Sequence, residues 1–427
     1  MRTGAERLPA RWGLLAHRDF RLLWLGETIS KFGSSVTTVV LPLVAIVELH
    51  AGAFTIGLLT ASVWLPWLVI GLPVGVWVGR MPRRTVMLVC NIVSASAFAS
   101  VPLAAALGVL TVAHLLAVGL LVGIASVFFT TAYQVFLPEL IEPGDLIEGN
   151  AKLQGSASAA QVAGPGVGGL LAQWVGAVAG LLVTALTFVL ATLALALIRT
   201  SPQRPDSQVT ERPSLRRDVA EGLRFIVRDP YLRTLTAFGS TANLALLGYQ
   251  SVLVIFLVRE VGVAPGIAGL LVSAGALGGI FGAVVARPLC ARLGTARGIL
   301  LSHLAASPFG LLLPMAANDW TLVLFVVGSF LLATGVMVCS VISASFRQTY
   351  TPPHLLSRVV STAMFVNYGA IPLGALLGGF LGSVIGLRPT MWIMMILLVL
   401  CWAILGMSPL RRRVDLPTSV AAPWTGY

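Results

Sequence analysis

Glu27 and Lys31 are the residues whose types and spacing point most directly to chemistry. They lie four positions apart in an apolar run, which places both side chains on one face of a helix. A charge at the centre of a bilayer costs about 2.5–3.5 kcal/mol, so the pair must face protein or a water-filled cavity. A carboxylate shielded from water beside a cation can carry protons. This predicts proton coupling or recognition of a charged substrate, with a structural pair as the alternative.

The composition requires these residues to sit in membrane helices. Of 427 residues, 57% are hydrophobic and 10% are charged, against about 25% charged in soluble domains. Apolar runs of about 20 residues, enough to cross a hydrocarbon layer, recur along the chain. Because backbone groups in lipid must bond internally, runs of this length are helices. The chain is therefore predicted to be an all-α membrane protein.

Twelve apolar runs have the length of membrane spans. They lie at 20–47, 53–78, 85–108, 111–136, 150–175, 178–198, 231–258, 265–289, 298–317, 320–346, 359–385 and 388–408. The longest polar stretch separates six spans from six. We expect an N-terminal six-helix half at 1–198, a cytoplasmic linker at 199–230, a C-terminal half at 231–410 and a cytoplasmic tail at 411–427. Apolar residues at helical spacing in the linker predict an amphipathic helix on the inner membrane surface: Leu215, Val219, Leu223 and Ile226.

The basic residues predict the orientation. With a cytoplasmic N-terminus, all but three of the 28 Lys and Arg lie on the cytoplasmic side or at its interface. Arg259 and Arg388 lie outside, and Lys31 lies in a span. We therefore expect a multi-pass protein of the inner (plasma) membrane with both termini in the cytoplasm. The net charge of +12 then reflects topology and attraction to lipid headgroups, and no nucleic-acid partner is expected.

No residue pattern indicates an enzyme or a metal site. The chain has no Gly-x-Ser-x-Gly elbow and no phosphate loop with Gly-Lys-Ser/Thr. The four cysteines lie in separate apolar runs without ligand spacing: Cys90, Cys290, Cys339 and Cys401. We expect no cofactor, no metal and no catalytic residue.

The two halves repeat each other. Gly57 matches Gly269 at an offset of 212, and Gly168-Gly169 matches Gly378-Gly379 at an offset of 210. Two parallel six-helix repeats are the layout of a carrier whose pseudo-symmetric halves rock about a central site. Two glycine rows with a four-residue step predict helix faces that pack closely: Gly71, Gly75 and Gly79, then Gly374, Gly378, Gly382 and Gly386.

Three motifs carry a resemblance to a known family. Residues 75–84, GVWVGRMPRR, resemble the loop signature of major facilitator superfamily transporters, except that Gly79 replaces the usual acid and Pro82 the later glycine. Residues 164–169, GPGVGG, resemble that family's antiporter motif. Residues 19–24 and 221–225, DFRLLW and EGLRF, look like the branch with enterobactin exporters and macrolide efflux proteins. The resemblance covers essentially the whole chain and implies the major facilitator fold.

The resemblance implies roles for the loop signature at 75–84 and for the antiporter motif at 164–169. Arg80, Arg83 and Arg84 would close the cytoplasmic side, through helix C-termini or through an acidic loop with Glu139, Glu142, Asp145 and Glu148. The alternative is simple anchoring at the inner interface. The antiporter motif would bend and closely pack span five and favour exchange over uptake: Gly164, Pro165, Gly168 and Gly169. Ordinary close packing is the alternative there.

Scattered polar and aromatic residues are candidates for a substrate cavity. These are Phe128, Tyr133, Gln134, Gln161, Asn243, Tyr249, Gln250, Asn367 and Tyr368. A mostly apolar pocket with few polar groups suits a lipophilic substrate. Interhelical hydrogen bonds are the alternative role for a lone Asn or Gln in a membrane helix.

Together these observations predict a secondary active transporter. It would export a lipophilic or amphipathic small molecule, such as an antibiotic, siderophore or other secondary metabolite, by proton antiport and alternating access. Its partners would be the substrate, protons and membrane lipids, and it would act as a monomer. Uptake or uncoupled facilitated transport of a small solute, or a sensor with the same fold and no transport, remain the alternatives.

Overall fold

The computed structural model describes residues 13–71, 73–142, 145–199 and 215–417, and every regular element in these residues is helical. The first half contains α1 (Arg18–Val47), α2 (Ala53–Ile70), α3 (Val74–Gly79), α4 (Arg83–Ala106), α5 (Val112–Leu140), α6 (Leu146–Trp174) and α7 (Ala177–Ala196). The second contains α8 (Leu215–Arg228), α9 (Pro230–Ile255), α10 (Pro265–Leu293), α11 (Thr295–Ala306), α12 (Leu322–Tyr350), α13 (Pro353–Val384) and α14 (Leu387–Gly406). Four short segments complete it: η1 (Gly13–Ala16), the π-helix η3 (Phe256–Val261), η4 (Ser307–Met315) and η5 (Pro409–Arg412).

The predicted all-α membrane fold is confirmed. Among the described residues, 11 helical segments are long and apolar enough to cross a membrane. The remaining long helix, α6, has 29 residues and is rich in Gly, Ala, Ser and Gln. It packs along α1 of its own half and α10 of the other. Protein neighbours therefore cover much of this helix and suit its small side chains.

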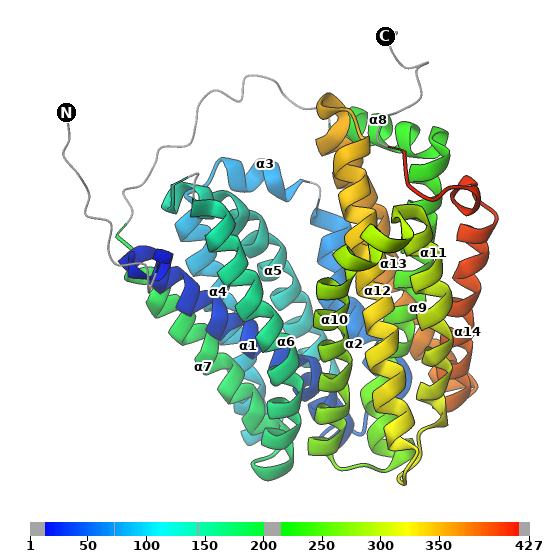
Figure 1. The fold of residues 1–427 in the computed structure, drawn as a ribbon. Helices are drawn as coiled ribbons and strands as arrows, with labels where there is room; N and C mark the ends of the chain where they lie inside the picture. The colour runs from blue at the N-terminus through cyan, green and yellow to red at the C-terminus, as the bar shows by residue number, and fades with distance from the viewer. Residues whose placement is uncertain (1–12, 72, 143–144, 200–214, 418–427) are drawn as a thin grey trace, which may run out of the picture.

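Span two is shorter than predicted, and the expected end at residue 78 is wrong. Helix α2 ends at Ile70, and a separate short helix, α3, follows Pro73. Proline lacks the N–H that would continue the α2 hydrogen-bond ladder. Figure 1 shows α3 lying across the end of the bundle. The first of the two predicted glycine rows, Gly71, Gly75 and Gly79, therefore forms no packing face, since the space around Gly75 and Gly79 is open.

Span nine also changes form. Helix α11 ends at Ala306, and the 3₁₀-helix η4 continues the crossing to Met315. Pro308 lies in the first turn of η4, where a missing N–H is tolerated, and Pro314 lies near its end. The expected span at 298–317 is thus present, but as two joined helical segments.

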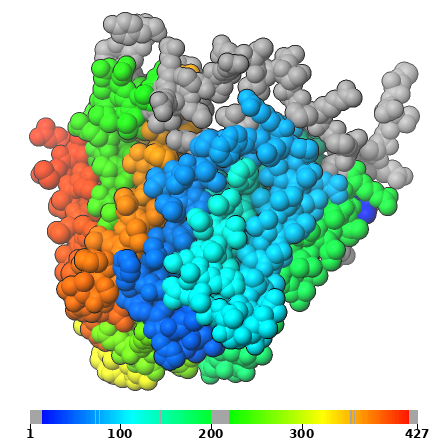
Figure 2. Space-filling view, turned by 180° about the vertical axis from the view of Figure 1, so that it is seen from behind, coloured from blue at the N-terminus to red at the C-terminus, as the bar shows by residue number. Residues whose placement is uncertain are grey.

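The two halves meet along two matching seams. Helix α2 packs along α13, and α6 packs along α10. In the view of Figure 2, the blue α2 lies directly beside the orange α13. Backbones touch at Gly57 and Gly379 in one seam and at Gly169 and Gly269 in the other. The seams are related by the sequence repeat, which confirms two pseudo-symmetric six-helix halves.

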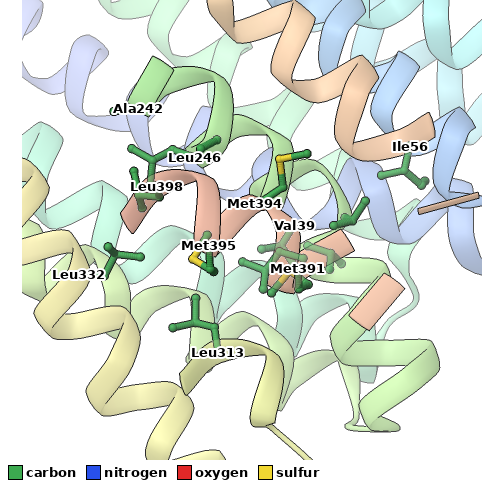
Figure 3. Close-up of a cluster of buried hydrophobic side chains, with 14 of the residues drawn as sticks. Val39, Ile56, Ala242, Leu246, Leu313, Leu332, Met391, Met394, Met395 and Leu398 are labelled. Carbon is green, nitrogen blue, oxygen red and sulfur yellow. The ribbon is translucent and has the colours of Figure 1, made fainter. Parts of the chain in front are cut away.

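The second half has a dense apolar core around α14. Met391, Met394, Met395 and Leu398 are fully buried. Figure 3 shows these side chains between α9 and η4, with Leu313 close by. Unbranched methionine fills irregular gaps between helices that carry glycine, as at Gly248, whose missing side chain leaves room for Met394. This core fixes α14 against α9.

Helix α8 crosses one end of the bundle (Figure 1) and packs on α13 and α9. Phe225 and Ile226 are buried, whereas Leu223 and Val227 are exposed. A helix is present at Leu215–Arg228, although Leu223, expected on its apolar face, is exposed. Its position on the inner membrane surface stays a prediction, and linker residues 200–214 and tail residues 418–427 lie outside the described residues.

We call the end of the bundle that carries α3 and α8 the basic end, because Arg83, Arg84 and the arginines of η5 lie there. The opposite end, with the loop between α1 and α2, is the far end.

Candidate functional site

A cavity of about 370 Å³ lies between the two halves. Its wall is formed by α1, α2, α4, α5 and α7 of the first half and by α9 of the second. Among the described residues, the second half contributes four: Leu247, Gln250, Ser251 and Val254. The first half therefore supplies most of the groups that a molecule in this cavity would touch.

The cavity wall combines aromatic rings with hydroxyl groups. Trp64, Phe98, Phe129 and Phe188 form its aromatic part. Four hydroxyls of α1 also line the cavity, and each donates to a carbonyl of its own helix: Ser30 to Glu27, Ser34 to Ser30, Thr37 to Gly33 and Thr38 to Ser35. Because their protons are already used, these hydroxyls offer oxygen lone pairs to the cavity.

Glu27 and Lys31 lie one helical turn apart, in different surroundings. Lys31 is exposed and lines the cavity, and it is the one charged residue in the described wall. Glu27 is 6% exposed and lies inside the protein, toward the basic end. Among the described residues, neither side chain forms an ion pair within 4.0 Å or a hydrogen bond. The pair thus faces protein and a cavity, as its charges require, and its role stays a prediction.

Two predicted cavity residues on α5 contact aromatic neighbours. Tyr133 stacks on Phe129 with ring centroids 6.4 Å apart, and it lies near enough to Glu27 for electrostatic interaction. Phe128 stacks on Trp77 of α3 at 6.1 Å, outside the central cavity. Tyr133 is thus not part of the described cavity wall, but it stacks on Phe129, which is.

The remaining candidates divide between cavity and helix contacts. Gln250 lines the cavity. Asn243 donates from Nδ2 to the main-chain oxygen of Asn367 at 3.3 Å, which is the interhelical bond considered above as the alternative role. Tyr368 contacts Trp67 edge-on at 5.6 Å and Trp64 at 6.2 Å, across the α2–α13 seam. Gln134 and Gln161 are exposed and Tyr249 is partly buried, all away from the central cavity wall.

Most residues of the cavity wall were not among the sequence candidates, and two of these are polar residues of α4. Asn91 and Ser94 of α4 line the cavity, and each is 4% exposed. Both interrupt the apolar run at 85–108, which was the available signal. Trp64 of α2 was also missed, because a tryptophan does not stand out in an apolar run. The spacing of Asn91 and Ser94 alone does not separate cavity residues from packing residues. The rotation of α4 decides which of its polar groups face the cavity.

The arginines of the loop between α3 and α4 bind the ends of two helices. Arg84 donates to the main-chain oxygens of Leu195 (3.2 Å) and Ala196 (2.6 Å), at the C-terminus of α7. Arg83 pairs with Glu139 of α5 at 2.9 Å. Arg80 is exposed and makes no ion pair among the described residues. Both expected kinds of partner are present, and both lie within the first half; the gating role stays a prediction.

A second contact tightens the basic end of the first half. Glu148, in the first turn of α6 and before its apolar part, accepts a hydrogen bond from the main-chain N–H of Leu14 at 3.0 Å. That bond, together with Lys152, lowers the pKa of the Glu148 carboxyl. Arg18 donates to the main-chain oxygen of Leu197 at 3.4 Å. The segment before α1 is thereby tied to α6 and α7.

The antiporter-like motif lies where three helices meet. Gly164 and Gly168 leave no room for a side chain against Ser35 and Val36 of α1. Gly169 contacts Gly269 of α10. Helix α6 runs unbroken through Pro165, and the next N–H, on Gly166, donates to Ser273 Oγ of α10 at 2.9 Å. The motif thus packs its helix against both halves, and its link to exchange stays a prediction.

Three hydrogen bonds between described side chains or main-chain groups join the two halves. Besides the one from Gly166, the main-chain N–H of Gly266 donates to Gln173 Oε1 at 3.1 Å. Arg259 donates from Nη2 to the main-chain oxygen of Ile46 at 3.1 Å. All three lie toward the far end. At the basic end, Arg83 and Arg84 bind described residues of their own half.

Within the described residues, no group of three His, Cys, Asp or Glu side chains is placed to hold a metal ion. The four cysteines are free thiols. The cavity between the halves is therefore the site on which a functional interpretation rests.

Two pseudo-symmetric six-helix halves around a central cavity define a membrane transporter. A family model described as Major Facilitator Superfamily matches residues 23–374 and 244–425. The chain belongs to the Major Facilitator Superfamily. It is thus a multi-pass membrane protein of a transporter family, as the motifs indicated.

The chain is similar to characterised members of this family. The multidrug efflux pump Tap of Mycolicibacterium fortuitum is 27% identical over 396 residues, which cover 90% of this chain and 94% of that protein. Tap of Mycobacterium tuberculosis is 28% identical over 410 residues, covering 92% and 94%. A crystal structure of a mutant of the nucleoside transporter NupG has the same fold, with a TM-score of 0.76, 12% identity and coverage of 91% and 99%.

Proposed function

We propose that this protein exports lipophilic or amphipathic small molecules across the plasma membrane in exchange for inward-moving protons. The observation that carries the proposal is the cavity between the halves, with Lys31 in its wall and Glu27 buried one turn away. The similarity to pumps named for multidrug efflux supports the outward direction. The concentration of arginines at the basic end supports placing that end in the cytoplasm.

Charge in the cavity supports exchange. When Glu27 is ionised, its charge balances that of Lys31, and the site is neutral overall. Protonation of Glu27 leaves the positive charge of Lys31 without a balancing charge. We propose that the substrate binds more tightly to the balanced, ionised pair than to the protonated site, since charges act strongly in a low-dielectric interior. Proton and substrate therefore oppose each other's binding, and by linkage this opposition is reciprocal. That is the requirement for antiport.

The contacts between the halves support alternating access. Hydrogen bonds at Ile46, Gly166 and Gln173 join the halves toward the far end. The glycine seams allow the halves to rock, because smooth backbone contacts do not interlock. We propose that Arg80, Arg83 and Arg84 gate the basic end and that the motif at 164–169 favours exchange. A substrate would enter from the cytoplasm or inner leaflet.

Proton movement in proteoliposomes tests the proposal. The purified protein is reconstituted with the pH dye pyranine inside, and forskolin, digoxigenin or cholic acid methyl ester is added outside. Exchange predicts that inward substrate movement drives protons out, so the interior becomes alkaline. Internal acidification on addition would indicate cotransport and support uptake. Substrate entry without a pH change would indicate uncoupled transport. No flux with any compound would favour the sensor alternative.

A further inference from the structure

Asn91 and Ser94 place unused hydrogen-bonding groups in the cavity wall. They lie three positions apart on α4, so they share one face of the helix. Each is 4% exposed, and both line the cavity. Neither side chain forms a hydrogen bond with any residue that the structure describes. Their polar atoms are accessible from the cavity, so a molecule bound there can pair with them.

The hydroxyls of α1 in the same cavity wall offer acceptors rather than donors. The hydroxyls of Ser30, Ser34, Thr37 and Thr38 donate to carbonyls of α1, so they present oxygen acceptors to the cavity. The amide of Asn91, the hydroxyl of Ser94 and the ammonium of Lys31 have N–H or O–H protons that no described residue accepts, and the hydroxyls of Ser126 and Thr130 on α5 are further donors in the same wall. Donors on α4 and at Lys31 thus face the same space as acceptors on α1.

The charge of the wall limits the charge of the ligand. Lys31 is the one charged residue of the described wall, so a cation would be repelled. An anion would be attracted, but it would also favour protonation of Glu27 and would bind together with the proton. Joint binding is cotransport, which opposes the exchange proposed above. A neutral ligand is not repelled by Lys31, and it does not favour binding together with the proton.

We infer that Asn91, Ser94 and Lys31 form a donor subsite that recognises an uncharged, oxygen-rich lipophile. Carbonyl or hydroxyl oxygens of the ligand accept hydrogen bonds from this subsite, and its own hydroxyls donate to the acceptors on α1. Its apolar rings pack against Trp64, Phe98 and Phe129. The inference rests on the proposed export function, because it names the substrate class of that same cavity.

Binding of one scaffold in three charge states tests the inference. The probes are cholic acid methyl ester (neutral), cholate (anionic) and the trimethylammonioethyl amide of cholic acid (cationic). Titration calorimetry is performed on the full-length protein in detergent. The wild type is expected to bind the ester at least about tenfold more tightly than the cation. Tighter binding of cholate or of the cation than of the ester would overturn the neutral class.

Variants of the wall separate a ligand contact from a structural effect. Asn91→Leu and Ser94→Ala are each expected to weaken binding of the ester by about five- to tenfold, the loss typical of one hydrogen bond. Ser100→Ala is the matched control, because Ser100 lies on α4 but pairs with His114 away from the cavity. Unchanged ester affinity in both wall variants would overturn the subsite. If Asn91→Leu fails to fold, Ser94→Ala removes one hydroxyl only and gives the same readout.

The two proposals fail in different ways. Weakened binding in the wall variants without proton movement in wild-type proteoliposomes would keep the subsite and reject antiport. Proton-coupled flux in wild-type proteoliposomes with unchanged binding in the wall variants would keep antiport and reject the subsite.

Discussion

Gly169 of α6 and Gly269 of α10 touch backbone to backbone across the seam between the two halves. A Cβ atom on either residue would collide with main-chain atoms of the other helix. The repeat places the same kind of contact between Gly57 and Gly379 in the second seam. The halves are thus joined by surfaces that are close yet free of interlocking side chains.

The seam contact predicts a strong effect of side chains at these glycines. Gly269→Val should destabilise the protein by about 1–3 kcal/mol, the usual effect of overpacking, and should abolish transport. Gly155→Ala on α6 is the matched control, because the space beside Gly155 is open. It should leave stability unchanged or raise it slightly. Thermal unfolding in detergent and flux in proteoliposomes measure both, and normal flux in Gly269→Val would refute the role of the seam.

The loop arginines should differ in their effect on stability. Arg84→Leu removes two hydrogen bonds to the C-terminus of α7 and should reduce stability by about 1–2 kcal/mol. Arg80→Leu is the control, since Arg80 is exposed and makes no hydrogen bond or ion pair with the described residues. Thermal unfolding of the two variants decides the point. Equal unfolding temperatures would show that the contacts of Arg84 contribute nothing measurable.

The bond from Arg259 to Ile46 should hold the far end closed. Arg259→Gln should lengthen the distance between spin labels on His50→Cys and Asn318→Cys, in a background without the native cysteines. Double electron–electron resonance measures this distance. Arg388→Gln is a matched far-end control, because Arg388 binds Glu260, Pro314 and Ala316, all within the second half. A distance distribution in Arg259→Gln equal to that of the parent would remove the bond from the gating scheme.

The sequence was sufficient to predict most of the spans, because long apolar runs depend on local composition. It failed at the end of α2, where Pro73 separates two helices within one apolar run. The candidate site was predicted less well. Which polar groups face a cavity depends on how each helix is rotated, so Gln161 is exposed while Asn91 lines the wall. Lys31 was a candidate, as the partner of Glu27, because a charge in an apolar run must face protein or a water-filled cavity.

The central claim is that Glu27 carries the exchanged proton, and Glu27→Gln tests it most directly. Glutamine keeps the shape of the side chain but cannot ionise. The variant should still exchange labelled for unlabelled cholic acid methyl ester across proteoliposomes, because counterflow needs no proton. It should show no substrate-driven pH change with pyranine inside. Retained counterflow with proton movement equal to that of the wild type would contradict the claim.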